Sequence, residues 1–139
     1  MGRRDDYIKY LAQVPLFSGC SQDELRRLSR HTTEIPVPEG HVLVKEGDPG
    51  LEFFIVVDGN AKVTRRGRKV GELGPGSFFG ELAVLVDRPR NATVTALGPM
   101  EVIVLTRREF TAALEEAPRL SRKIMTGMAA RLADADAKL

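Results

Sequence analysis

Residues 80–94 read GELAVLVDRPRNATV, and two charged side chains in this stretch, Glu81 and Arg90, could act together on one small ligand. An arginine presents a planar fork of N–H donors that suits an anionic phosphodiester. A carboxylate repels a phosphate but accepts a hydrogen bond from a hydroxyl group a few ångströms away. A ribose 2′-OH beside a cyclic phosphate satisfies both side chains. The alternative is a structural ion pair or a solvated loop.

The sequence between the two charges predicts one or two turns of helix inside a region of strands. The N-terminus of a helix exposes unpaired backbone N–H groups and the positive end of the helix dipole, which together attract a phosphate. Gly80 and Ala83 are small enough to leave that approach open. We therefore expect the phosphate of a ligand at the start of this helix, with Arg90 brought to it by the following loop.

The N-terminal region predicts two short helices. Apolar residues recur at helical spacing between Tyr7 and His31, and Pro15 and Gly19 interrupt the pattern. The segment 21–24, Ser-Gln-Asp-Glu, has the form of a capping box, in which the serine and glutamate side chains each bond the other residue's backbone N–H. The second helix should therefore begin near Gln22.

The middle of the chain, from Thr33 to about Thr106, predicts seven or eight short strands. Brief apolar runs such as FFIVV and EVIVL alternate with turn signals rich in glycine and proline. Their regular spacing leaves little room for crossover helices, so an antiparallel arrangement is favoured over a parallel sheet. We expect a mainly β fold with flanking helices: an antiparallel β-roll of the double-stranded β-helix or jelly-roll type, interrupted by the short helix described above.

The C-terminal region predicts two more helices, separated by Pro118. The first spans Arg107 to Glu116, and the second carries an apolar stripe at four-residue spacing, formed by Leu120, Ile124, Met128 and Leu132. A chain of 139 residues suits one domain, 1–139, which we divide into N-terminal helices (1–31), a β-roll (32–106) and C-terminal helices (107–139).

Composition excludes several classes of function. The net charge of +2 is too small to indicate nucleic acid, no apolar run is long enough to cross a membrane, and a single cysteine, Cys20, cannot form an internal disulfide. The N-terminus lacks the pattern of a signal peptide, so we expect a cytoplasmic protein. His31 and His41 come with no third ligand in register, and no set of catalytic residues is visible. We therefore predict no metal site and no enzyme.

One basic cluster remains, at a predicted hairpin tip. Arg65, Arg66, Arg68 and Lys69 surround Gly67. We interpret this cluster as a solvated turn, with a phosphate-binding site as the alternative.

The segment Phe79-Gly80-Glu81-Leu82-Ala83, followed by Arg88-Pro89-Arg90-Asn91-Ala92-Thr93-Val94, closely resembles the phosphate-binding cassette of cyclic nucleotide-binding domains, as in protein kinase A regulatory subunits and catabolite activator protein. The resemblance covers most of the chain, including VPLFSGCSQDELRRL before the strands and VIVLTRREF after them. The triplet at 71–73 has the same letters, GEL, without the downstream arginine, so the triplet alone indicates little. We refer to residues 79–94 as the cassette.

The resemblance implies a role for each cassette residue. Glu81 would accept a hydrogen bond from the ribose 2′-OH, Arg90 would pair with the cyclic phosphate, and backbone N–H groups at Ala83 and at Asn91 or Ala92 would complete the phosphate cradle. Phe79, Gly80 and Leu82 belong to the same cassette and are included in the predicted site. Two strand residues at matching positions, Val63 and Val70, would lie against the base or sugar, although ordinary core packing explains them equally well.

Asn91 departs from the better-known cassettes. Protein kinase A-like cassettes have alanine at this position, whereas cGMP-dependent kinases have a threonine that reaches the guanine amino group. The Asn91 side chain could accept from that amino group or support the loop. Because the hydroxyl is missing, we favour cAMP as the ligand and keep cGMP as the alternative.

The resulting hypothesis is a cyclic nucleotide-binding regulatory module that acts on an unknown effector protein through rearrangement of its C-terminal helices. We expect no membrane association and no DNA-binding domain in this chain, while the C-terminal stripe is suited to forming a homodimer. The alternative is an interaction or dimerisation module with a degenerate cassette that binds no ligand.

Overall fold

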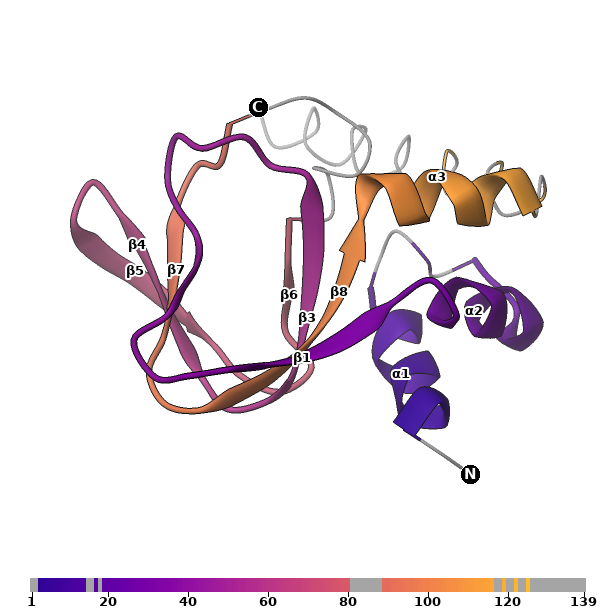
Figure 1. Ribbon diagram of the computed structural model, residues 1–139, viewed down its shortest axis with the longest axis horizontal. Coiled ribbons are helices and arrows are strands. Elements are labelled where there is room, and N and C mark those ends of the chain that lie inside the picture. Colours follow the sequence, from indigo (N-terminus) through magenta and orange to yellow (C-terminus); the bar gives the residue numbers. More distant parts are fainter. Residues whose placement is uncertain are drawn as a thin grey trace. The chain divides into compact units, whose positions relative to one another are not determined.

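The computed structural model describes residues 3–14, 17, 19–80, 89–116, 119, 122 and 125. Within these ranges the chain forms three helices and eight strands (Figure 1). In chain order the elements are α1 (Arg3–Ala12), α2 (Gln22–Ser29), β1 (Thr33–Val37), β2 (Val42–Val44), β3 (Glu52–Asp58), β4 (Ala61–Arg65), β5 (Arg68–Leu73), β6 (Phe78–Phe79), β7 (Thr93–Ala96), β8 (Met100–Thr106) and α3 (Arg107–Glu116).

The helix α2 begins where the capping-box pattern predicts. The Ser21 hydroxyl accepts from the Glu24 backbone N–H at 3.2 Å, and the Ser21 backbone N–H donates to the Glu24 carboxylate at 2.7 Å. Two N–H groups that the helix cannot pair internally are thereby satisfied. Leu25 and Leu28 are buried, so α2 packs through the apolar face that its spacing defines. The prediction of a helix starting at Gln22 is confirmed.

The strands form two four-stranded antiparallel sheets, in the orders β1-β8-β3-β6 and β2-β7-β4-β5. Strands far apart in sequence are neighbours in both sheets, because β8 lies between β1 and β3, and β7 lies between β2 and β4. The sequence predicted an antiparallel β-roll with flanking helices, and this fold class is confirmed.

Both sheets contribute to the core of the roll. Residues two apart on a strand point to the same face, and the buried residues of β7 follow this alternation, whereas β8 is buried continuously from Val102 to Leu105. The Phe54 ring of β3 stacks on the Phe79 ring of β6, with centroids 4.8 Å apart and planes inclined by 14°. The core cluster consists of Val37, Phe54, Val56, Ala61, Val94, Ala96, Met100, Val102 and Val104.

The β4–β5 hairpin combines a tight turn with a β-bulge. Arg66 and Gly67 form its two-residue loop with φ angles of 54° and 78°, the positive pair that a type I′ turn requires. The register shifts between Val63 and Thr64. Residues three apart on a regular strand point to opposite faces, yet Lys69 and Glu72 form an ion pair at 2.9 Å. The bulge therefore changes which β5 side chains share a face near the tip.

The helix α3 begins at a second reciprocal cap. The Thr106 hydroxyl accepts from the Glu109 N–H at 3.1 Å, and the Thr106 N–H donates to the Glu109 carboxylate at 2.9 Å. The predicted helix from Arg107 to Glu116 is confirmed. Its cap falls at the end of the strand region, so β8 passes directly into helix.

The chain divides into two compact units, residues 1–31 with 110–139, and residues 32–109. The boundary falls within α3. The organisation of the chain as one domain stays a prediction, and the predicted apolar stripe from Leu120 to Leu132 lies outside the described residues, as does the predicted cassette helix. Among the helices described, none is long and apolar enough to cross a membrane.

Candidate ligand-binding pocket

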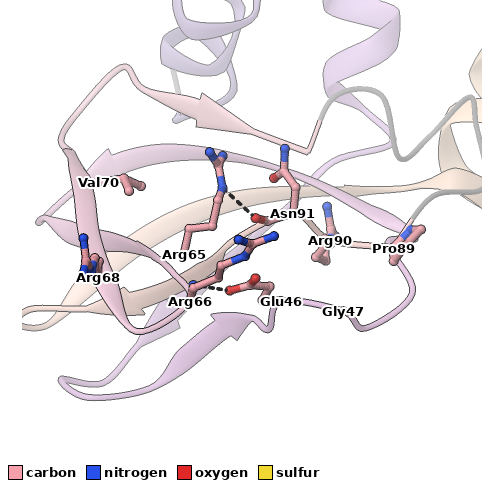
Figure 2. A pocket seen from close by; sticks show the side chains of 9 residues that line it. All are labelled: Glu46, Gly47, Arg65, Arg66, Arg68, Val70, Pro89, Arg90 and Asn91. Atoms are coloured by element: carbon pink, nitrogen blue, oxygen red, sulfur yellow. Dashed lines mark hydrogen bonds between the residues drawn. The ribbon is translucent and has the colours of Figure 1, made fainter.

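A pocket of about 780 Å³ lies beside the tip of the β4–β5 hairpin (Figure 2). Its volume falls within the range of roughly 300–1,000 Å³ that is typical of small-molecule sites. Three segments line it: the loop after β2, the hairpin, and the segment before β7. The lining residues are Glu46, Gly47, Arg65, Arg66, Arg68, Val70, Pro89, Arg90 and Asn91.

Backbone pairing fixes the position of Arg90. Pro49 and Pro89 form an isolated antiparallel bridge. The Arg90 N–H donates to the Asp48 carbonyl at 2.8 Å, and the Gly47 N–H donates to the Arg90 carbonyl at 2.8 Å. The loop after β2 thus holds both polar backbone groups of Arg90, which removes the local freedom that an exposed loop would otherwise have.

The described residues satisfy the hydrogen-bond donors of the Arg90 side chain only in part. Its Nη2 donates to the Glu52 carbonyl at 2.8 Å, whereas its Nε is buried and has no hydrogen-bond partner among the described residues. Burial lowers the pKa of Arg90, and the charge of Glu52 opposes that lowering. A buried N–H without an acceptor costs free energy, and a nearby anion would favour the charged form. The guanidinium is therefore oriented by the protein and suited to an acidic ligand.

Gly80 makes room for this guanidinium. Its φ angle is +80°, a conformation that residues with a side chain rarely adopt. A Cβ at this position would lie 2.5 Å from Arg90 Nη1 and 2.8 Å from the Glu52 carbonyl oxygen. The sequence suggested that Gly80 leaves space for a phosphate, and the structure adds that Arg90 needs the same space.

The residues after Arg90 connect the cassette to the hairpin and to the loop after β2. The Arg65 Nε donates to the Asn91 carbonyl at 3.0 Å, and the Glu46 N–H donates to the Thr93 hydroxyl at 2.9 Å. Asn91 lines the pocket, whereas Ala92 is buried. The cassette end is thus held from both sides, which positions Asn91 at the pocket wall.

The two valines that the sequence left undecided have different environments. Val70 lines the pocket and is 55% exposed, so its side chain is open to a ligand. Val63 packs against the core cluster. Val63 thus fits the core-packing interpretation, whereas contact between Val70 and a ligand stays a prediction.

Of the predicted site residues, Val70, Arg90 and Asn91 line one pocket, and Gly80 lies against the Arg90 guanidinium. Three others pack elsewhere: Phe79 stacks on the core, Val63 packs against it, and Ala92 is buried. The remaining three, Glu81, Leu82 and Ala83, lie outside the described residues.

The sequence prediction omitted the hairpin arginines from the site. Arg65, Arg66 and Arg68 all line the pocket with Arg90, so the cluster interpreted as a solvated turn is exposed but also forms a pocket wall. Glu46 and Gly47, which no motif singled out, also line it. The sequence feature that could have identified them is the high density of arginine around Gly67. The position of these arginines beside the cassette depends on the register of the hairpin, which the sequence does not show.

The described residues form a two-sheet roll with an oriented arginine beside an open, arginine-lined pocket, and these features suit a small anionic ligand. Residues 34–117 match the family described as cyclic nucleotide-binding domain. This match spans more than half of the chain. The chain belongs to the cyclic nucleotide-binding domain family.

Individual relatives agree with this assignment. The chain is 39% identical to the cAMP-dependent protein kinase regulatory subunit of Mycosarcoma maydis, over 78% of this chain and 22% of that protein. It therefore spans about a fifth of that relative. The crystal structure of the N-terminal domain of a transcriptional regulator from Streptomyces coelicolor A3(2) superposes with a TM-score of 0.85 at 27% identity, covering 91% of this chain and 94% of that one. The regulatory domain of Toxoplasma gondii PKA, co-crystallised with cAMP, superposes with a TM-score of 0.75 at 26% identity, covering 95% of this chain and 50% of that one.

Proposed function

We propose that this chain is a sensor domain that binds cAMP, with the cyclic phosphate on Arg90. The environment of the Arg90 side chain carries the proposal. The Glu52 carbonyl orients the guanidinium, and Gly80 leaves room for it. The buried Nε–H has no acceptor among the described residues. A phosphodiester oxygen supplies both the missing acceptor and the opposite charge.

Two similarities support cAMP as the nucleotide. The Mycosarcoma relative is named a cAMP-dependent protein kinase regulatory subunit, and the Toxoplasma structure contains cAMP. Both proteins are regulatory, which supports a binding module and not an enzyme. Asn91 lines the pocket and leaves cGMP as the competing nucleotide.

We assign the ribose 2′-OH to Glu81, on the strength of the cassette resemblance. A hydrogen bond to a charged group contributes about 1.5–3 kcal/mol. Glu81→Ala is therefore expected to weaken cAMP binding roughly tenfold to a hundredfold, while affinity for 2′-deoxy-cAMP, which has no 2′-hydroxyl, stays nearly unchanged. Isothermal titration of both ligands into the parent and the variant measures this difference.

The chain contains a matched control for Glu81. Glu72 occupies the same Gly-Glu-Leu triplet, but it lies on β5, pairs with Lys69 and does not line the pocket. Glu72→Ala should leave both affinities unchanged. Equal losses of cAMP and 2′-deoxy-cAMP affinity in Glu81→Ala would contradict the assignment of the ribose 2′-OH to Glu81. If the parent protein does not bind cAMP, the alternative of an interaction module without a ligand is favoured.

We further propose that cAMP acts on an effector by changing the arrangement of the C-terminal helices. The boundary between the two compact units lies within α3, so this helix belongs partly to each. Met125 is 68% exposed, and the flexible methionine side chain adapts to more than one packing surface. A ligand shifts such an equilibrium only if it binds one arrangement more tightly than the other.

The expected result is a change in amide hydrogen exchange over residues 107–139 when cAMP is added. A tenfold change in exchange rate there would correspond to a change of about 1.4 kcal/mol in the free energy of local opening. Exchange measured by mass spectrometry, with and without saturating cAMP, tests the proposal. Unchanged exchange in this region, together with titration heat that proves binding, would contradict it.

A further inference from the structure

The pocket carries more positive charge than one cyclic phosphate requires. Four of its nine lining residues are arginines, and Glu46 is the one carboxylate among those described. A cyclic mononucleotide brings a single negative charge, which the proposed function places on Arg90. Among the described lining residues, the Glu46 carboxylate alone is available to balance the three hairpin arginines.

The hairpin tip brings its like charges together in an unfavourable arrangement. Arg65 and Arg68 are directly opposite each other in the β4–β5 register, and like charges in that position repel. Between them, Arg66 has a φ of 54°, the one positive value among the described residues that are not glycine. Asparagine, aspartate or glycine is preferred there in a type I′ turn. The tip thus places Arg65, Arg66 and Arg68 within four residues of sequence despite this repulsion.

Hydrogen bonds hold the arginine tip against the pocket. The Arg66 N–H donates to the Glu46 carboxylate at 3.0 Å, so this carboxylate also serves as a backbone anchor. Arg65 uses its Nε to bond the Asn91 carbonyl. This contact uses the inner nitrogen of the Arg65 guanidinium, so the terminal amino groups can donate to a ligand.

The hairpin charges are separated from the Arg90 site. Figure 2 shows Arg68 and Arg90 at opposite ends of the pocket, with Arg65 and Arg66 between them. A phosphate on Arg90 therefore leaves the Arg68 end of the pocket available to a second group. One guanidinium is sufficient to bond the acceptor edge of a base, whereas three arginines on one pocket wall supply the positive charge that suits a second phosphate.

We propose that the hairpin end of this pocket is a second phosphate subsite and that the chain binds cyclic dinucleotides, whose two phosphodiesters would occupy the Arg90 end and the hairpin end. The inference rests on the proposed function in that Arg90 receives the first phosphate. Val70 lies on the wall with Arg68, where an apolar side chain suits the face of a base.

The test compares cAMP with cyclic di-AMP in phosphate-free buffer, using isothermal titration of the parent, Arg68→Gln and Lys69→Gln. Lys69 is the matched control, because it is adjacent in sequence but pairs with Glu72 and does not line the pocket. We expect the parent to bind cyclic di-AMP about tenfold more tightly than cAMP. Arg68→Gln should lower cyclic di-AMP affinity about tenfold more than it lowers cAMP affinity, and so abolish most of that advantage. Lys69→Gln should change neither affinity.

Inorganic phosphate distinguishes a second phosphate of the ligand from a free anion. Under the proposal it competes with cyclic di-AMP and leaves cAMP affinity unchanged. If phosphate instead strengthens cAMP binding and cyclic di-AMP does not bind, the subsite takes a free anion and the dinucleotide assignment is overturned.

Different experimental outcomes would contradict the cAMP-sensor proposal and the second-subsite proposal. Tight cAMP binding with no cyclic di-AMP advantage, or equal effects of Arg68→Gln and Lys69→Gln, overturns the second subsite and leaves the cAMP sensor intact. Arg68-dependent binding of cyclic di-AMP without cAMP binding supports the subsite and contradicts the cAMP proposal. Thermal melting of each variant verifies folding, and Arg68→Gln should melt no lower than the parent because it removes a repulsive charge.

Discussion

Arg90→Leu is expected to lower cAMP affinity by orders of magnitude. The substitution removes a charge-assisted contact and leaves the phosphodiester facing an apolar side chain, a loss of about 2–5 kcal/mol in binding, or roughly thirtyfold to several thousandfold in Kd. Because Nη2 already bonds the Glu52 carbonyl, the guanidinium is oriented before the ligand arrives, and little of its contact energy is spent on ordering the side chain. Isothermal titration with cAMP measures the loss.

Two control variants separate charge from geometry in this experiment. Arg90→Lys keeps the charge but loses the planar fork, so its affinity should fall between those of the parent and Arg90→Leu. Arg26→Leu removes an exposed arginine on α2 that pairs with Asp23, and it should bind as the parent does. If Arg90→Leu remains folded by circular dichroism and binds cAMP with parental affinity, Arg90 does not hold the phosphate.

Local sequence patterns predicted much of the fold, because helices and strands are determined largely by signals within a few residues. The capping box at Ser21 and Glu24 located the start of α2. The weaker cases are strands without an apolar run. The strand β5 reads RKVGEL and is an edge strand of its sheet, so polar side chains replace the apolar pattern of a buried strand. The strand β6 has two residues, too few for any periodicity.

The candidate site was predicted less completely, because its walls come from segments distant in sequence. Arg90 was identifiable from the cassette spacing. The pocket-lining role of Arg65 and Arg68 was not, since it depends on the register shift in the hairpin and on the hydrogen bond from Arg65 to the Asn91 carbonyl. A one-residue difference in register exchanges the faces of a strand. Composition alone therefore could not decide between a solvated turn and a pocket wall.

Gly80→Ala is expected to reduce both stability and cAMP affinity, because the new Cβ would collide with two groups that define the site. It would lie 2.8 Å from the backbone carbonyl oxygen of Glu52, which cannot move without disturbing β3, and 2.5 Å from Arg90 Nη1. The positive φ adds about 1–2 kcal/mol for a residue with a side chain. Together with the collision we expect a loss of about 2–4 kcal/mol in the free energy of unfolding, measured by urea denaturation.

Gly40→Ala separates the backbone effect from the collision. Gly40 has a φ of +83°, close to the +80° of Gly80, but a Cβ there would meet nothing within 4 Å. This control should therefore lose only the backbone contribution of about 1–2 kcal/mol and keep parental cAMP affinity. In Gly80→Ala, displacement of the guanidinium should also weaken cAMP binding at least about tenfold, since a charged hydrogen bond is lost or misaligned. If both variants were destabilised equally and both bound cAMP as the parent does, the contact between Gly80 and Arg90 would have no part in forming the phosphate site.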